Sequence, residues 1–433
     1  MSTEPEVATT VTGRSVGRIS GAILIGSALG FAVVILTGRV FSPADYAVFM
    51  TFWGLLFGLG SALSPLEQEL ARVSAVATQN QAKISRDAVT ALLVGLGAVA
   101  VVGLVPLVPA VSDRLFLGHY GLGVVVLVAG VAFAAQFAVR GLLIGNDQVG
   151  SYAGLIVVEA AVRPLLILAA VLAAVADLVP VAVAVAVGSF AWVLFVPKVR
   201  AHIDPALPGD PSGVVVRRML MLLSSAALTA SVITGYPAMV SLLAPGGDPN
   251  ALGGLYAALG VARVPLLLFA AVQALAVPVV VRLSASPEGL RKLRRLLAAG
   301  TVGAVALGAL GALVGYLVGP WLVDLVFGHK YVVADWAVAG LVWSSVIVAI
   351  VQLLAAVLVA RVRPAQVLAI WAVVAVASAL VLALGPGDTI ARAVLGLVTG
   401  PTLGLLVAVG FVAKSDPRDI SVQVAGPAAE PPR

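Results

Sequence analysis

The 433-residue sequence contains no cysteine. This absence excludes disulfide bonds, metal sites built from thiolates and cysteine nucleophiles. Histidine is nearly as scarce, because the chain has only His119, His202 and His329, which are too scattered along the sequence to indicate a metal centre. The sequence therefore predicts neither a bound metal nor a cofactor.

Charged residues make up only 11% of the sequence, whereas a soluble domain has roughly 25%. Hydrophobic residues make up 61%, and the mean hydropathy is +1.12. A surface with so few charges cannot face water, and the apolar stretches are continuous rather than alternating as in a transmembrane barrel. These properties predict an all-α polytopic membrane protein.

Patterns that would indicate catalysis are also missing from the sequence. There is no Gly-rich loop ending in lysine that could hold a phosphate, no serine–histidine arrangement, and no long outer loop with paired carboxylates. We therefore expect a transporter rather than an enzyme.

A transmembrane helix needs about 20 mostly apolar residues, and short polar joints divide this sequence into runs of that length. The first run has no cleavage pattern at its end, so it predicts a retained helix rather than a signal peptide. Twelve spans are predicted, at 16–38, 46–66, 88–110, 121–140, 152–174, 178–196, 217–243, 253–281, 296–318, 334–360, 366–384 and 390–413.

The basic residues are unevenly distributed between the two sides that these spans define. If the N-terminus is cytoplasmic, 20 of the 26 lysines and arginines fall in the inner segments, and the outer loops hold only Arg39, Arg114, Lys330 and Arg392. This skew fits the positive-inside rule and predicts that both termini are cytoplasmic. The net charge of +6 then belongs to cytoplasmic loops and does not indicate nucleic-acid binding. The content of Ala, Val, Gly and Arg indicates a bacterium with GC-rich DNA, and hence its inner membrane.

Two short motifs occur twice at the same offset. RVSA at 72–75 matches RLSA at 282–285, and LFLGHY at 115–120 matches LVFGHKY at 325–331, with 210 residues between the members of each pair. A repeat after six spans predicts two six-helix bundles related by a pseudo-two-fold axis along the membrane normal, with a substrate site between them. The predicted segments are a cytoplasmic tail 1–15, a bundle 16–196, a linker 197–214, a bundle 215–413 and a disordered tail 414–433.

Two segments of the chain resemble polysaccharide flippases of the Wzx type. Residues 37–62, TGRVFSPADYAVFMTFWGLLFGLGSA, are similar to that family's polar turn, acid–aromatic pair and aromatic-rich second span, and residues 323–334, VDLVFGHKYVVA, resemble its entry into the tenth span. The family belongs to the multidrug/oligosaccharidyl-lipid/polysaccharide exporter superfamily. The resemblance implies two six-helix bundles, alternating access, and movement of polyprenyl-diphosphate-linked glycans from the inner to the outer leaflet.

Two arginines are predicted to lie deep in the membrane, one in each bundle. Arg163 and Arg263 each follow the start of a span by about 11 residues, which is roughly 16 Å at 1.5 Å per residue and close to the middle of a roughly 30 Å hydrocarbon core. A lipid-facing arginine at that depth costs at least about 2.5–3.5 kcal/mol. Both side chains are therefore expected to face protein or a wet cavity.

The four candidate substrate-binding residues are Arg263, Arg163, Glu159 and Arg140. Glu159 precedes Arg163 by one helical turn, in the favourable order for an ion pair, so the pair is either structural or faces the substrate cavity. Arg263 has no acid three or four residues away, and a diphosphate, which a guanidinium binds bidentately, is a candidate counter-charge. Arg140, at the cytoplasmic end of its span, is interpreted as an interfacial anchor, with recruitment of the substrate headgroup as the alternative.

The leading functional hypothesis is a flippase for a polyprenyl-diphosphate-linked oligosaccharide in cell-envelope polysaccharide biosynthesis. The first alternative is an ion-coupled multidrug or small-molecule exporter, which would favour acids in the cavity, whereas Glu159 is the one deep acid against two arginines. The second is a membrane glycosyltransferase or ligase, which would need an acid on an outer domain or loop. We expect a monomer surrounded by membrane lipids, with a proton or sodium ion as the coupling ion where one is used.

Overall fold

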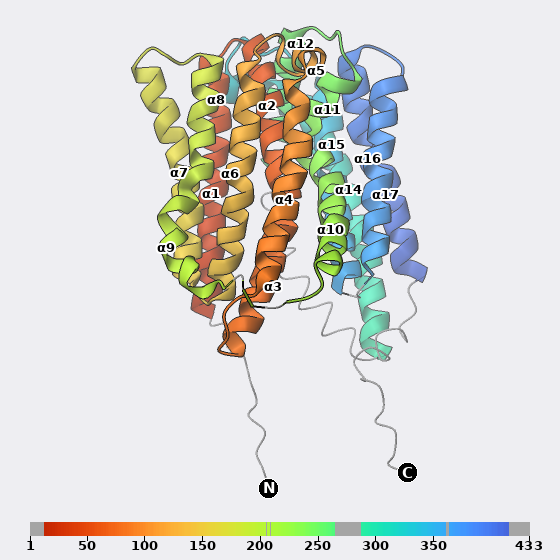
Figure 1. Cartoon of the computed structure of the whole chain (residues 1–433). Helices are drawn as coiled ribbons and strands as arrows, with labels where there is room; N and C mark the ends of the chain where they lie inside the picture. Colours follow the sequence, from red (N-terminus) through yellow and green to blue (C-terminus); the bar gives the residue numbers. More distant parts are fainter. Residues whose placement is uncertain (1–12, 205, 208, 265–286, 361–362, 415–433) are drawn as a thin grey trace. The chain divides into compact units, whose positions relative to one another are not determined.

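The computed structural model describes residues 13–204, 206–207, 209–264, 287–360 and 363–414 (Figure 1). Apart from one isolated bridge between Ile84 and Ile203, these residues form helices and their connections. The helices are α1 (Gly13–Val40), α2 (Pro43–Ala62), α3 (Ser64–Gln79), α4 (Arg86–Leu104), α5 (Pro109–Phe116), α6 (Gly121–Gly145), α7 (Val149–Leu172), α8 (Leu178–Val187), α9 (Val196–Val199), α10 (Ser212–Ile233), α11 (Tyr236–Leu243), α12 (Pro249–Ala262), α14 (Pro287–Phe327), α15 (Asp335–Ala360), α16 (Pro364–Leu384) and α17 (Thr389–Lys414), with 3₁₀ segments at Val105–Leu107, Gly188–Phe195 and Arg200–His202.

Eleven helical stretches in the described residues are long and apolar enough to cross a membrane. They correspond to eleven of the twelve predicted spans. The remaining span, 253–281, lies mostly outside the described residues, which include α12 and the two residues after it. The prediction of an all-α polytopic membrane protein is confirmed.

The predicted span 217–243 is interrupted in the structure. α10 ends at Ile233 and α11 begins at Tyr236. Pro237 lies in the first turn of α11, where the missing N–H removes no helical hydrogen bond. Gly58 of α2 packs at this interruption, since a Cβ at Gly58 would lie 3.3 Å from the Cα of Gly235. The interruption thus allows the backbones of two elements to approach closely.

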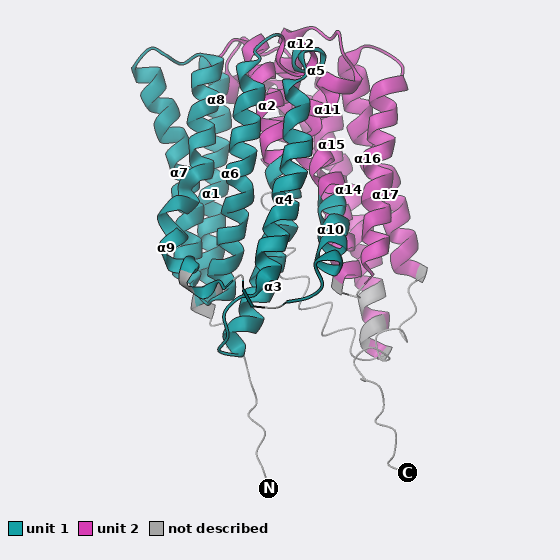
Figure 2. Cartoon of the chain, viewed as in Figure 1, with its two compact units in different colours: residues 1–40, 59–113, 118–226 teal, residues 41–58, 114–117, 227–433 magenta. Residues whose placement is uncertain are grey.

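The described helices form two compact units, shown in teal and magenta in Figure 2. Unit 1 draws on residues 1–40, 59–113 and 118–226, and unit 2 on residues 41–58, 114–117 and 227–433. α2 and α10 therefore each contribute one part to each unit. The bundle boundaries expected from chain order, 16–196 and 215–413, stay a prediction.

In unit 1, α6 packs against α3 through glycines. Gly141 and Gly145 of α6 have no room for a Cβ, because backbone carbonyls of Glu67 and Ala71 on α3 occupy that space. α3 and α6 can approach closely only when such positions carry no side chain. This approach brings Glu67 within reach of Arg140, as described below.

In unit 2, the two segments that carry the flippase resemblance contact each other. The ring of Tyr46 on α2 lies 5.8 Å from the ring of Phe327 and 5.4 Å from that of Tyr331, measured between centroids. The ammonium of Lys330 donates a hydrogen bond of 2.5 Å to the carbonyl oxygen of Phe41. The turn before α2 and the turn after α14 thus form one packed structure.

The two glycines of the predicted repeat adopt the same kind of backbone conformation. Gly118 follows α5 with φ of 88°, and Gly328 follows α14 with φ of 103°. Glycine adopts this left-handed region without strain, and it commonly ends helices there. Residues 72–75 lie in α3, whereas their predicted counterpart 282–285 lies outside the described residues. The superposition of the two halves stays a prediction.

Candidate functional site

Arg263 directly follows the last residue of α12 in unit 2. Asp248 caps the start of this helix by accepting a hydrogen bond of 3.0 Å from the backbone N–H of Asn250. The helix is anchored by Ala257 and Ala258, which are fully buried. Because α12 begins at Pro249, Arg263 lies about 21 Å along the helix axis at 1.5 Å per residue. This is farther from the helix start than the roughly 16 Å expected from the sequence, because the helix begins earlier than predicted.

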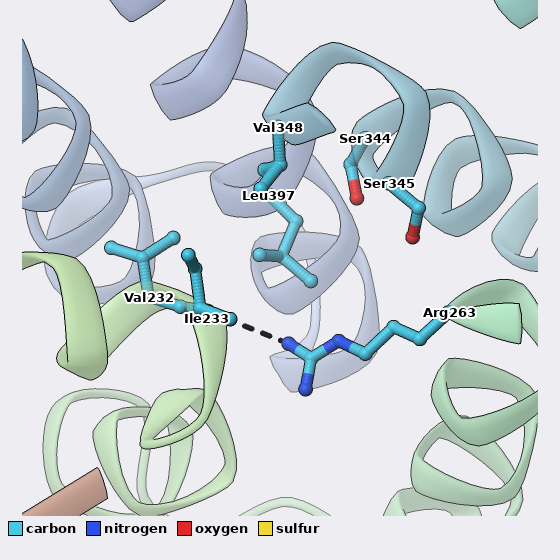
Figure 3. Close-up of a pocket in the computed structure, with 7 residues that line it drawn as sticks. All are labelled: Val232, Ile233, Arg263, Ser344, Ser345, Val348 and Leu397. Carbon is cyan, nitrogen blue, oxygen red and sulfur yellow. Dashed lines mark hydrogen bonds between the residues drawn. The ribbon is translucent and has the colours of Figure 1, made fainter. Parts of the chain in front are cut away.

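The side chain of Arg263 enters a small cavity in unit 2 (Figure 3). One of its terminal nitrogens donates to the carbonyl oxygen of Val232 at 3.4 Å, which is long for an N–H···O bond. On the other side of the cavity, Ser344 and Ser345 of α15 present their hydroxyls to the same space. The cavity has room for about one water molecule. Its lining is completed by Ile233, Val348 and Leu397.

Arg263 has no counter-charge within the part of the chain that the structure describes. The ion pairs found there all involve other residues. The sequence from 265 to 286, which directly follows, contains no Asp or Glu. Arg263 is thus a part-buried cation whose weak hydrogen bond to a neutral carbonyl is a poor substitute for an anion.

Glu159 and Arg163 form the i, i+4 ion pair that the sequence predicts. An Arg163 terminal nitrogen lies 2.5 Å from the Oε1 of Glu159, and the two side chains are only 11% and 7% exposed. Arg163 also donates from Nε to the carbonyl oxygen of Val185 at 3.4 Å, and its guanidinium lies 5.8 Å from the ring centroid of Phe133. Gly188 packs against this guanidinium, since a Cβ there would lie 2.7 Å from its Nε. These contacts lie within unit 1, so a role in a cavity between bundles stays a proposal.

Arg140 is held by a second acid in unit 1. Its Nε lies 3.0 Å from Oε2 of Glu67, and its side chain is only 18% exposed. Tyr152 joins the two residues, because its hydroxyl donates to Glu67 at 2.7 Å and accepts from Arg140 at 3.3 Å. The Arg140 guanidinium also lies over the rings of Phe137 and Tyr152, at 5.0 Å and 5.4 Å from their centroids. The sequence does not predict this carboxylate partner, which α3 places beside Arg140, and the interpretation of Arg140 as an interfacial anchor stays a prediction.

Sequence reasoning missed three polar residues of this region. Glu67 pairs with Arg140 from an element distant in the sequence, and Tyr152 contacts it from the next helix, so the spacing within one helix gives no signal of either. Gln136 is fully buried one turn before Arg140 on α6, and neither of its amide atoms has a hydrogen-bond partner among the described residues. A buried glutamine within an apolar span is a signal that the sequence does contain, since buried polar groups need partners. Glu159 lies near enough to interact electrostatically with both Glu67 and Arg140.

The predicted linker 197–214 belongs to unit 1, where it is hydrogen-bonded to Ile84. The backbone N–H of Ile84 donates to the carbonyl oxygen of His202 at 2.8 Å, and the N–H of Asp204 donates back to Ile84 at 3.0 Å. Beyond these bonds, Glu69 of α3 accepts from Arg218 of α10 at 2.5 Å. The linker is thus held against the rest of unit 1 by backbone hydrogen bonds, and it continues directly into α10.

Comparison with other proteins finds full-length relatives. No family model matches the chain. Rv1510 of Mycobacterium tuberculosis, an uncharacterized protein, is 30% identical over 407 residues, which cover 92% of each chain. Rv3630 of the same organism, also uncharacterized, is 29% identical over 415 residues, or 93% of each chain.

Solved structures with a similar fold are MATE transporters. An inward-facing multidrug resistance MATE family transporter of the MOP superfamily has a TM-score of 0.68 at 13% identity, covering 95% of this chain and 100% of that one. An outward-facing MATE family transporter has a TM-score of 0.58 at 15% identity, covering 95% and 97%. A point mutant of the Vibrio cholerae MATE transporter VcmN has a TM-score of 0.56 at 17% identity, covering 93% and 98%. The chain therefore belongs to the family of Rv1510, and it has the multi-pass helical fold of the MATE transporters.

Proposed function

We propose that the chain is a flippase that moves a polyprenyl-diphosphate-linked oligosaccharide from the inner to the outer leaflet by alternating access. The fold of MATE transporters supports a membrane transporter. The observation that carries the anionic substrate is Arg263, a part-buried cation without a carboxylate partner in the described residues. A diphosphate would supply the missing counter-charge.

The chemistry of the cavity suits a phosphate group. A guanidinium can donate two parallel hydrogen bonds to phosphate oxygens, and the hydroxyls of Ser344 and Ser345 lie on the same cavity. The bond of Arg263 to Val232 is long, at 3.4 Å, so exchanging it for a charged acceptor is favourable. Because the cavity holds about one water molecule, the proposal requires it to widen when substrate enters.

The arginines of unit 1 are proposed to act differently, because each already has an acid. Arg163 is paired with Glu159, and Arg140 with Glu67. A diphosphate would have to compete with these carboxylates, which could take up protons when displaced. We therefore propose that the diphosphate binds first to Arg263. It contacts Arg163 and Arg140 later, when it displaces Glu159 and Glu67.

The alternative is an ion-coupled exporter of organic cations. Such a substrate would need an acid that is free to pair with it, whereas Glu67 and Glu159 both pair with arginines. No feature of the described residues favours the second alternative, a glycosyltransferase or ligase. The flippase is thus the function that the charge distribution supports best.

A reconstitution assay tests the proposal. Purified protein is placed in liposomes with a fluorescent polyprenyl-diphosphate-linked disaccharide, and membrane-impermeant dithionite reports the fraction in the outer leaflet. We expect the wild-type protein to equilibrate the probe, Arg263→Ala to lose this activity, and Arg263→Lys to keep part of it. Full activity of Arg263→Ala, with unchanged folding by circular dichroism, would contradict the assignment.

A further inference from the structure

We propose that the N-terminal end of α14 is a binding surface for anionic phospholipid headgroups. This helix runs unbroken for 41 residues, from Pro287 to Phe327. At 1.5 Å per residue it is about 60 Å long, or twice the roughly 30 Å thickness of a hydrocarbon core. Part of α14 must therefore extend beyond the apolar layer, and the sequence of that part, PEGLRKLRR, is strongly basic.

One face of α14 packs on protein and the opposite face is open. Gly308, Gly315 and Gly319 lie against valines of α15, where a Cβ would come closer than an ordinary van der Waals contact. On the other side, Leu307 and Leu317 are 63% and 69% exposed. The most apolar window of this span is only 6% buried, which is the smallest fraction among the eleven candidate spans of the described residues. In a membrane, this open apolar face contacts lipid.

Two of the basic residues, Lys292 and Arg295, lie toward the lipid-facing side of the helix. On a helix with 3.6 residues per turn, Lys292 lies within about 10° of the mean direction of the exposed apolar side chains, and Arg295 within about 70°. Arg291, Lys292 and Arg295 are exposed. None of them forms an ion pair with a carboxylate in the described part of the chain. The exposed side of α14 thus changes from apolar to cationic toward the N-terminal end of the helix.

We call Arg291, Lys292 and Arg295 the basic cluster. Aromatic residues near the C-terminal end of α14 locate this basic cluster relative to the bilayer. Trp321 is 59% exposed and Tyr316 is 48% exposed on α14, and exposed Trp and Tyr side chains favour the membrane interface. Arg295 lies 26 residues before Trp321, or about 39 Å along the helix. A bilayer with its headgroups is about 40–45 Å thick, so Arg295, together with Arg291 and Lys292, falls in the opposite headgroup layer.

The charges on the helix also favour an external anion. Arg291 and Arg295 are four residues apart, and Lys292 and Arg295 are three apart, so like charges repel on the helix surface. Glu288, three residues before Arg291 and four before Lys292, offsets only part of this positive charge. Anionic phosphate groups of lipids would relieve this repulsion, and each Lys or Arg near such a surface strengthens binding roughly fivefold. The distribution of Lys and Arg predicts that this is the cytoplasmic leaflet.

The absence of cysteine permits a direct test in the full chain. Ala299 is exposed on α14, one turn from Arg295. An Ala299→Cys variant is labelled with bimane and reconstituted in phosphatidylcholine that contains equal small fractions of nitroxide-labelled phosphatidylglycerol or phosphatidylcholine. We expect the phosphatidylglycerol label to quench at least about threefold more strongly, and this preference to fall at an ionic strength of about 1 M.

Variants assign the preference to the cluster. In the labelled protein, the triple change Arg291→Gln, Lys292→Gln and Arg295→Gln should bring the quenching ratio near one. A control with the same loss of charge at other exposed positions, Lys83→Gln, Arg86→Gln and Arg200→Gln, should keep the preference. The double variant Arg291→Lys and Arg295→Lys conserves the charge and should keep the preference for phosphatidylglycerol. This result would show that the triple variant loses the preference through its loss of charge and not through misfolding. Equal quenching by both lipids in the otherwise unchanged protein, or a preference that survives the triple change, would overturn the proposal.

Discussion

Replacing Arg163 by alanine should destabilise the protein by about 3–5 kcal/mol, because it leaves the carboxylate of Glu159 buried without a partner. The side chains of Arg163 and Glu159 are 7% and 11% exposed, so water cannot take over the lost contacts. The additional change Glu159→Gln removes the stranded charge and should recover about 2 kcal/mol or more. With the single variant Glu159→Gln measured as well, the double-mutant cycle gives the coupling energy between the two residues.

The assay is unfolding of the purified protein in mixed micelles, followed by far-ultraviolet circular dichroism. Leu166→Ala on the same helix is the control, because Leu166 is 37% exposed and its truncation should cost little. A smaller loss of unfolding free energy for Arg163→Ala than for Leu166→Ala would refute a buried, unpaired Glu159. A further loss on adding Glu159→Gln to the Arg163→Ala variant would refute it as well. Transport by a refolded double variant would show that the pair is structural alone.

Three further predictions use the same preparation or simple fusions. Gly188→Ala should destabilise the protein by about 1–3 kcal/mol in the unfolding assay, because its methyl group would displace the guanidinium of Arg163. Tyr152→Phe should cost about 1–3 kcal/mol by leaving an oxygen of Glu67 without its donor; an unchanged unfolding curve would show that water replaces the hydroxyl. Reporter fusions test the orientation, and a single reversed reporter would break the span assignment. We expect fusions to read as outside at Gly247 and Gly387, and as inside at Asp210 and Asp416.

The elements and contacts that depend on local sequence were predictable. Span positions follow from apolar runs of sufficient length, and eleven of them are present in the described residues. The pair of Glu159 and Arg163 also depends on local sequence alone, because a spacing of four residues places both side chains on one helix face. Neither prediction needs knowledge of which helices are neighbours.

Contacts between distant segments could not be read in the same way. The pair of Arg140 with Glu67 is not predictable from local spacing, because Glu67 reaches Arg140 only through the close approach of α3 to Gly141 and Gly145 of α6. The packing of Gly58 of α2 at the interruption after Ile233 is likewise a contact between distant segments. Hydrophobicity alone does not distinguish such an interrupted span from a continuous one. Arg263 was identifiable because an arginine without a nearby acid is visible in the sequence.

Binding of polyprenyl diphosphate to the purified protein tests the central claim, that Arg263 recognises a diphosphate. A labelled short-chain polyprenyl diphosphate is titrated against wild-type protein, Arg263→Gln, and the control Arg114→Gln at an exposed position. We expect Arg263→Gln to weaken binding at least about tenfold, since a charge-assisted hydrogen bond contributes about 1.5–3 kcal/mol, and Arg114→Gln to bind as the wild type does. Equal affinity of Arg263→Gln and wild type, or tighter binding of a lipophilic cation such as tetraphenylphosphonium than of the diphosphate, would contradict the account.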